Sequence, residues 1–154
     1  MKHLHLLFLT LISTLTIGSS FYDKGDDKGW IQNRTEMKKE KIKITVNGQT
    51  FKATLLDNNS VKAFTDMLPL TIKMIELHGN EKYGELKNSL PISPSNPKTI
   101  TIGDLLLYGD NTLVLFYETF PTSYSYTALG RVDNPTGLAS ALGSGNVTVA
   151  FELE

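Results

Sequence analysis

Apolar and polar residues alternate over two short runs that flank Asn47-Gly48. The apolar positions are Ile42, Ile44 and Val46 before this pair, and Phe51, Ala53 and Leu55 after it. Alternation with a period of two indicates a strand, and Asn-Gly favours a two-residue type I′ turn. We therefore predict a hairpin in which Ile44 faces Phe51 and Ile42 faces Ala53 on the buried side. Lys43 then faces Lys52 on the opposite side of the hairpin. Because two like charges repel each other, that opposite side must be open to solvent.

The remainder of the chain predicts short strands and two short helices. We expect strands over residues 70–77, 99–102, 105–108, 112–118, 124–132 and 146–153. The first has a phase slip near Met74, which predicts a bulge or burial on both faces. Residues 78–97 hold several Gly and Pro and form the least regular part, and Gly130 is expected to break a strand.

The two helices are short and have recognisable ends. The first is expected to begin at Ser60 and stop at Pro69, and the second to begin at Thr136 and end at Gly143. The strand at 112–118 is apolar on both faces, which is typical of a central strand covered on both sides. Two short helices are too few for regular crossovers between parallel strands. The pattern therefore predicts an all-β, mainly antiparallel barrel or sandwich.

The N-terminal segment has the layout of an export signal. A basic start precedes an apolar run over residues 4–17, and small residues follow at 18–20. We predict a signal peptide over residues 1–20, with an uncleaved membrane anchor as the alternative. Residues 21–41 are rich in charge and glycine and are expected to form a flexible linker, although Trp30 leaves an interaction arm as a second interpretation. We therefore predict that the folded domain comprises residues 42–154. The export signal predicts that the protein is periplasmic or extracellular.

The composition of the chain excludes several classes of function. Without residues 1–20 the formal net charge of −1 becomes −2, because Lys2 is the one charged residue removed. This balance argues against a nucleic-acid partner. The chain has no cysteine, and His78 is the one histidine outside residues 1–20. These counts exclude a disulfide framework, a thiolate nucleophile and a multi-histidine metal site, and we predict neither a metal nor a cofactor.

Several blocks of sequence resemble the family of bacterial cyclophilin-like domains. They are residues 68–72, 79–83, 103–110, 113–117, 122–127, 129–132 and 141–145. Together they cover essentially the whole predicted domain. The resemblance implies an all-β, closed cyclophilin-like barrel with two short helices. It implies no particular reaction, because a fold alone does not carry function.

The sequence departs from true prolyl isomerases of the cyclophilin type. Those enzymes resemble one another in a Phe-His-Arg segment and a Gln-Gly-Gly-Asp segment. Here Phe-His-Arg is missing, and Gly103-Asp104 lacks the Gln-Gly that should precede it. No catalytic residue is therefore carried over from the family.

The best candidate for a ligand site lies between Phe120 and Arg131. This stretch concentrates hydroxyl groups and aromatic rings, and tyrosine offers rigid contact area with a hydrogen-bonding tip. An arginine can hold a carboxylate or a peptide carbonyl in a fork. We predict a ligand site at the barrel mouth. Its residues are Tyr124, Tyr126, Thr127 and Arg131, with Tyr83 from an earlier loop.

A plainer interpretation and a second candidate site stand beside this one. The stretch also fits a Thr- and Tyr-rich strand with one solvated face, in which Arg131 pairs with Asp133 or Glu118. A second candidate for chemistry is the loop around His78, where Glu76, Glu81 and His78 are candidates for weak metal binding or proton transfer, but no second imidazole supports it.

The leading functional prediction is a non-catalytic module that binds an unknown peptide or small molecule outside the cytoplasm. A divergent peptidyl-prolyl cis-trans isomerase is the alternative. A third possibility is an accessory domain that acts through a partner protein. Contact with a membrane is expected only through an uncleaved N-terminal segment.

Overall fold

The computed structural model describes residues 39–154. The predicted signal peptide, most of the predicted linker and Trp30 lie outside these residues, so those expectations stay predictions. The first strand, β1, begins at Lys41, one residue before the expected start of the domain. Within the described part of the chain, neither helix has the length and apolar character that crossing a lipid bilayer requires.

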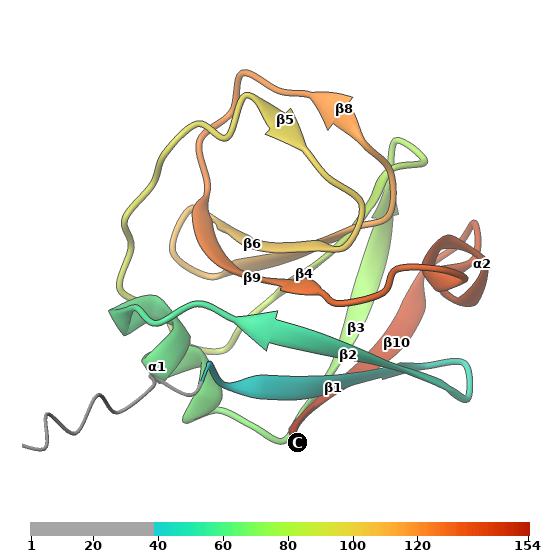
Figure 1. Ribbon diagram of the computed structural model, residues 1–154, viewed down its shortest axis with the longest axis horizontal. Helices are drawn as coiled ribbons and strands as arrows, with labels where there is room; N and C mark the ends of the chain where they lie inside the picture. Colours follow the sequence, from blue (N-terminus) through green and yellow to red (C-terminus); the bar gives the residue numbers. More distant parts are fainter. Residues whose placement is uncertain (1–38) are drawn as a thin grey trace, which may run out of the picture. The chain divides into compact units, whose positions relative to one another are not determined.

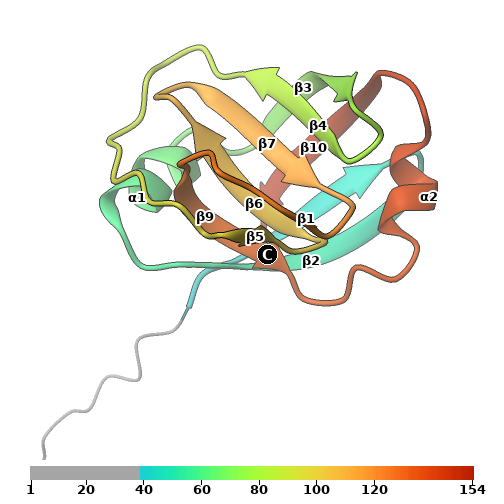
Figure 2. The ribbon, with the colours of Figure 1, turned by 90° about the horizontal axis from the view of Figure 1, so that it is seen from above.

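Eight antiparallel strands close into a barrel (Figures 1 and 2). In their order around the barrel they are β1 (Lys41–Val46), β10 (Val147–Leu153), β3 (Leu70–Leu77), β4 (Glu81–Glu85), β7 (Thr112–Phe116), β6 (Asp104–Tyr108), β9 (Thr127–Val132) and β2 (Gln49–Leu55). Closure pairs every strand on both sides and leaves no open sheet edge. The predicted all-β, closed antiparallel barrel with two short helices is confirmed.

The β1–β2 hairpin has the predicted register. Ile44 pairs with Phe51 and Lys43 with Lys52. Asn47 and Gly48 both have positive φ, 47° and 76°, as a type I′ turn requires.

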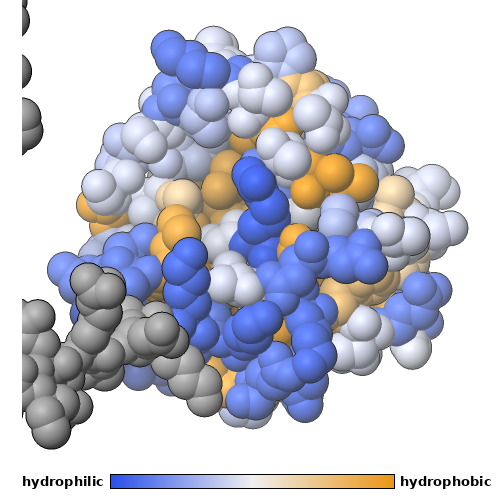
Figure 3. All heavy atoms as spheres, in the orientation of Figure 1, coloured by the Kyte–Doolittle hydropathy of each residue, from blue (hydrophilic) through white to orange (hydrophobic). Residues whose placement is uncertain are grey.

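The like-charged Lys43–Lys52 pair is tolerated because acidic residues lie beside it. Lys43 pairs with Glu152 at 3.8 Å, and Lys52 pairs with Glu154. Further ion pairing at this surface joins Lys41 to an aspartate that follows β9. Figure 3 shows the resulting hydrophilic region over β1 and β2.

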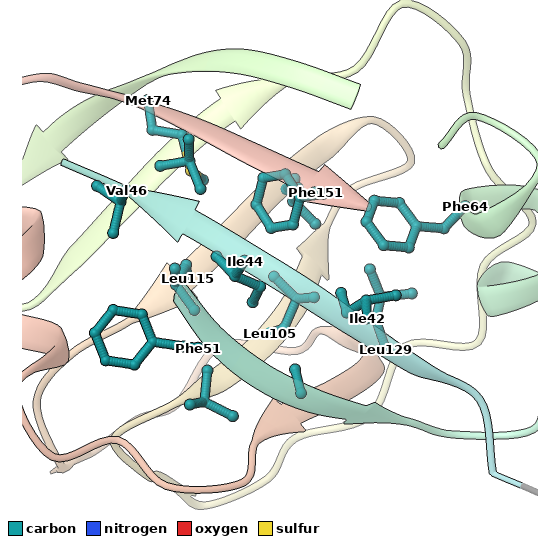
Figure 4. Close-up of a cluster of buried hydrophobic side chains, with 14 of the residues drawn as sticks. Ile42, Ile44, Val46, Phe51, Phe64, Met74, Leu105, Leu115, Leu129 and Phe151 are labelled. Atoms are coloured by element: carbon teal, nitrogen blue, oxygen red, sulfur yellow. The ribbon is translucent and has the colours of Figure 1, made fainter. Parts of the chain in front are cut away.

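Apolar side chains fill the barrel interior. Eight strands enclose a space that side chains can fill without leaving a channel. Figure 4 shows this core, in which Phe64 from α1 meets Phe151 of β10 in an edge-to-face contact with 6.1 Å between ring centroids. Both rings are fully buried. The alternating residues predicted for the first hairpin all contribute to this one cluster.

The helices differ from prediction at their first residues. Helix α1 (Asn59–Thr65) is capped by Asn58, whose Oδ1 accepts the Val61 amide at 2.9 Å. Ser60 was the wrong cap, because its buried hydroxyl donates to the Pro91 carbonyl instead.

Helix α2 also begins without the predicted cap. It spans Leu138–Leu142. Its N-cap residue is Gly137, and no side chain caps its first turn. Its end at Gly143 is confirmed, and the positive φ of 66° there explains the glycine.

Strand β7 is buried on both faces, as its sequence predicts. Leu113 and Leu115 join the barrel core, whereas Val114 and Phe116 belong to a second apolar cluster on the outside of the barrel. A small two-stranded sheet of β5 (Thr99–Ile100) and β8 (Phe120–Pro121) covers this outer cluster. The barrel wall therefore separates two apolar clusters.

Two predictions about β3 and β4 were wrong. Strand β3 pairs with both neighbours without a bulge, so its phase slip reflects apolar residues on its outer face, where Ile75 is exposed and Leu77 lines a cavity. The region expected to be least regular contains β4, which forms part of the barrel wall. Its polar sequence concealed it, because the one buried long side chain in it is Lys82.

Candidate functional site

A cavity of about 540 Å³ lies on the outer wall of the barrel. Its floor comes from the outward faces of β4 and β7 and the ends of β3 and β6, and its other side comes from β8 and the loop that follows it. The lining residues are Leu77, His78, Asn80, Glu81, Tyr83, Tyr108, Thr112, Val114, Phe120, Pro121, Thr122, Ser123, Tyr124 and Tyr126. A concave, mainly apolar space with a few polar groups is typical of a small-ligand site.

Aromatic rings dominate this cavity. The Tyr108 ring lies 5.7 Å from that of Tyr126 and 6.2 Å from that of Tyr124, between centroids. Tyr126 also meets the buried ring of Phe116 edge-on at 5.7 Å. Tyr124 and Tyr108 remain 62% and 48% exposed. The row of rings thus runs from the outer apolar cluster to solvent.

Backbone hydrogen bonds hold the tyrosine-bearing loop in place. Tyr126 and Ser95 exchange two amide–carbonyl hydrogen bonds of 3.0 and 2.9 Å. Asn96 Nδ2 donates to the Ser123 carbonyl at 2.9 Å, and the Thr122 amide donates to the Lys98 carbonyl at 2.9 Å. The irregular segment before β5 therefore positions one side of the cavity.

The polar side of the cavity carries a carboxylate and an unused acceptor. Glu81 is half-buried, and burial raises the pKa of its carboxyl group, although the electrostatic effect of the neighbouring His78 opposes this shift. Asn80 Oδ1 is buried and has no hydrogen-bond partner among residues 39–154. A buried acceptor without a partner costs free energy. Burial, together with the negative charge of Glu81, raises the pKa of Tyr126.

Of the five residues predicted to bind a ligand, three line the cavity and two do not. Tyr83, Tyr124 and Tyr126 lie together there. Thr127 is buried, and its Oγ1 accepts the Ser93 amide at 2.9 Å. The Arg131 Nε donates to Asp104 Oδ1 at 2.6 Å.

The ion pair between Arg131 and Asp104 has the geometry of a structural interaction. Asp104 is buried, and its second oxygen accepts the Thr101 amide at 2.8 Å. The ion pair expected under the plainer interpretation therefore exists, but with Asp104 as the partner rather than Asp133 or Glu118. The cavity itself lies on the outer wall and not at the mouth of the barrel.

A buried polar cluster closes one end of the barrel interior. The ammonium of Lys82 is fully buried; it pairs with Glu76 and donates to the carbonyls of Gly143 and Gly145 at 2.7 Å each. Tyr117 donates its hydroxyl to Glu76 at 2.7 Å. Burial alone would raise the pKa of Glu76, but the hydrogen bonds from Lys82 and Tyr117 outweigh it and lower the pKa.

This cluster removes Glu76 from the chemistry considered for the His78 loop. The carboxylate already accepts hydrogen bonds from Lys82, Tyr117 and the Gly79 amide. Among residues 39–154, no three His, Asp or Glu side chains gather closely enough to hold a metal ion.

Sequence reasoning did not single out Tyr108 or Asn80 as lining residues. Tyr108 carried a usable signal, because it ends a strand just before the Gly109 turn and so places a ring at the end of the barrel wall. Asn80 carried none that separates it from an ordinary turn residue.

Comparison with known proteins identifies the family. The model of the cyclophilin-like family matches residues 44–152, so the chain belongs to this family. Among solved structures, the solution structure of a hypothetical protein from Archaeoglobus fulgidus matches with a TM-score of 0.53 and 17% sequence identity. The match covers 75% of this chain and 95% of that one, and at this identity it shows a shared fold alone. No curated protein matches the chain.

Proposed function

We propose that this cyclophilin-like domain is a non-catalytic binding module that takes a small molecule or a short peptide in the outer-wall cavity. The observation that carries the proposal is the row of tyrosine rings beside a cavity of about 540 Å³, in which Tyr108 and Tyr124 are solvent-exposed and Tyr126 is buried. Exposed, well-fixed aromatic rings offer contact area at low entropic cost.

The proposal places recognition on Tyr83, Tyr124 and Tyr126. Thr127 and Arg131, predicted from sequence, are not cavity-lining residues. Export of the protein stays part of the proposal, supported by the pattern of residues 1–20 alone. N-terminal sequencing of protein recovered outside the cytoplasm would test it, and a chain that keeps Met1 there would contradict cleavage.

Removing one exposed ring should weaken binding. A library of small aromatic fragments would be screened against the full chain by ¹H–¹⁵N NMR. For hits that shift amides of residues 77–83 and 120–126, Tyr124→Ala should raise Kd by about tenfold, since one lost stacking contact costs about 1.4 kcal/mol. The matched control is Ile92→Ala, which truncates an exposed apolar residue outside the cavity and should leave Kd unchanged.

The same screen tests the sequence prediction for Arg131. Arg131→Lys keeps the charge beside Asp104 while changing the fork geometry. Our proposal expects unchanged Kd for this variant. Loss of binding in Arg131→Lys together with normal binding in Tyr124→Ala would move the site away from the cavity.

A protease-coupled assay with proline-containing peptides should show no rate enhancement. The reason is that the isomerase motifs are missing and that the one arginine of the domain, Arg131, is held by Asp104 away from the cavity lining. Enhancement that disappears in Tyr126→Phe would instead favour the divergent isomerase.

A further inference from the structure

We propose that the outer-wall cavity selects organic cations, meaning a protonated amine or a quaternary ammonium group on an apolar or aromatic body. This inference rests on the proposed function and adds the chemical class of its ligand. Two features of the cavity lead to it, its aromatic lining and the Glu81 carboxylate.

The first feature is the aromatic lining. Tyr83, Tyr108, Tyr124, Tyr126 and Phe120 all contribute to the cavity surface. The face of an aromatic ring carries partial negative charge and attracts an ammonium group within about 6 Å of the ring centroid. Several rings around one space are the usual solution for binding ammonium groups that cannot be held by hydrogen bonds alone.

The second feature is a carboxylate that shares the cavity with a single basic side chain, His78. Glu81 is the one carboxylate that lines the cavity, and no lysine or arginine lines it. No Lys or Arg of residues 39–154 lies within 4.0 Å of the Glu81 carboxylate. The neighbouring Lys82 cannot reach it, because its ammonium is committed to Glu76 and two carbonyls inside the barrel. A half-buried carboxylate without a partner is stabilised by a cation that enters beside it.

The same carboxylate also sets the hydrogen bonds that a ligand can make. The Glu81 oxygens are acceptors, so they call for donors on the ligand. A protonated amine brings up to three donors and no acceptor. An anionic ligand would meet the opposite arrangement, with a carboxylate and ring faces opposing it.

Three probes of similar size test the inference: 2-phenylethylamine, 2-phenylethanol and 3-phenylpropionate, which are cationic, neutral and anionic at pH 8. Each would be titrated into the full chain and followed by ¹H–¹⁵N NMR. The amine should shift amides of residues 77–83 and 120–126 and bind at least about tenfold more tightly than the alcohol, which corresponds to about 1.4 kcal/mol. The propionate should bind most weakly.

A matched pair of variants isolates the charge. Glu81→Gln should abolish most of the preference for the amine while leaving the affinity for the alcohol nearly unchanged. Glu85→Gln removes a carboxylate from the same strand but outside the lining, so it should keep the preference. Because Tyr124→Phe keeps the ring and Tyr124→Leu removes it, the amine should tolerate the first change and lose affinity with the second.

The outcomes separate this inference from the proposed function. Equal binding of amine and alcohol at the cavity would overturn the preference for cations and leave the binding site in place. An amine preference that Glu85→Gln reduces as much as Glu81→Gln would also overturn it, because the effect would then come from the general field of the protein. If none of the three probes shifts the cavity amides, the inference fails, and the fragment screen alone decides the proposed function.

Discussion

Replacing Lys82 with methionine should lower the free energy of unfolding by about 3–5 kcal/mol, the usual cost of removing one partner of a buried ion pair. All three ammonium protons of Lys82 have partners inside the barrel: Glu76 and the carbonyls of Gly143 and Gly145. Methionine fills a similar volume, so the loss arises from the carboxylate and carbonyls left without a donor. Urea unfolding followed by circular dichroism would measure it.

The control for this prediction is a lysine of the neighbouring strand. Lys73 on β3 is exposed, so Lys73→Met should change stability by no more than about 0.5 kcal/mol. In the double variant Lys82→Met with Glu76→Gln, the costs should not add, because the second change removes the uncompensated charge. Additive costs would contradict the coupling inferred from the geometry.

The pH dependence gives a second readout of the same cluster. The pKa of Glu76 is lowered in the folded protein, so its ionised form contributes stability above its ordinary pKa. That contribution is lost as the pH falls through the lowered value, so the difference between wild type and Glu76→Gln should shrink below about pH 4. A difference that stays constant in acid would contradict the assignment.

Gly130→Ala should destabilise the barrel by about 3 kcal/mol, the upper end of the usual cost of overpacking. A Cβ at this position would lie 2.5 Å from the Thr54 carbonyl oxygen and 3.0 Å from the Leu55 Cα. Both are backbone atoms of β2, which cannot move without disturbing the β2–β9 pairing. Chemical denaturation would again give the free energy of unfolding.

Two other glycines calibrate this effect. Gly145→Ala should cost little, because an added Cβ would meet nothing within 4 Å and φ is not positive there. Gly84→Ala should fall between the two, since the nearest atom, 2.7 Å away, is the flexible end of the Ile72 side chain. Trimming that side chain with Ile72→Val should recover part of the loss at Gly84 and none of the loss at Gly130. Equal costs at all three glycines would contradict the role of close backbone approach.

Local sequence chemistry predicted the parts of this fold that depend on neighbours in the chain. The register of the first hairpin follows from Asn47-Gly48 and from the alternation around it. The double burial of β7 follows from its apolar residues on both faces. Gly130, in contrast, was expected to break a strand, but it lies inside β9 next to a bulge at Leu129.

The missed parts depend on contacts between distant residues. Strand β4 looks polar because Lys82 occupies a core position, and it can do so only because Glu76 and the α2–β10 connection supply its partners. The cavity could be predicted only in part for the same reason. The tyrosines were recognisable by type, but their convergence with Glu81 requires the register of β4 against β7.

The two sides of the cavity differ in how freely they can change during evolution. Each strand of the cavity floor also contributes side chains to the barrel interior. In β4, for example, Tyr83 lines the cavity and Lys82 points into the barrel. An insertion or register shift in such a strand would therefore disrupt folding. Residues 122–125, opposite, belong to a loop that contributes to neither apolar cluster, and loops tolerate substitution and insertion. Relatives that share this barrel can therefore diversify in what they recognise by altering this loop while inheriting the floor unchanged.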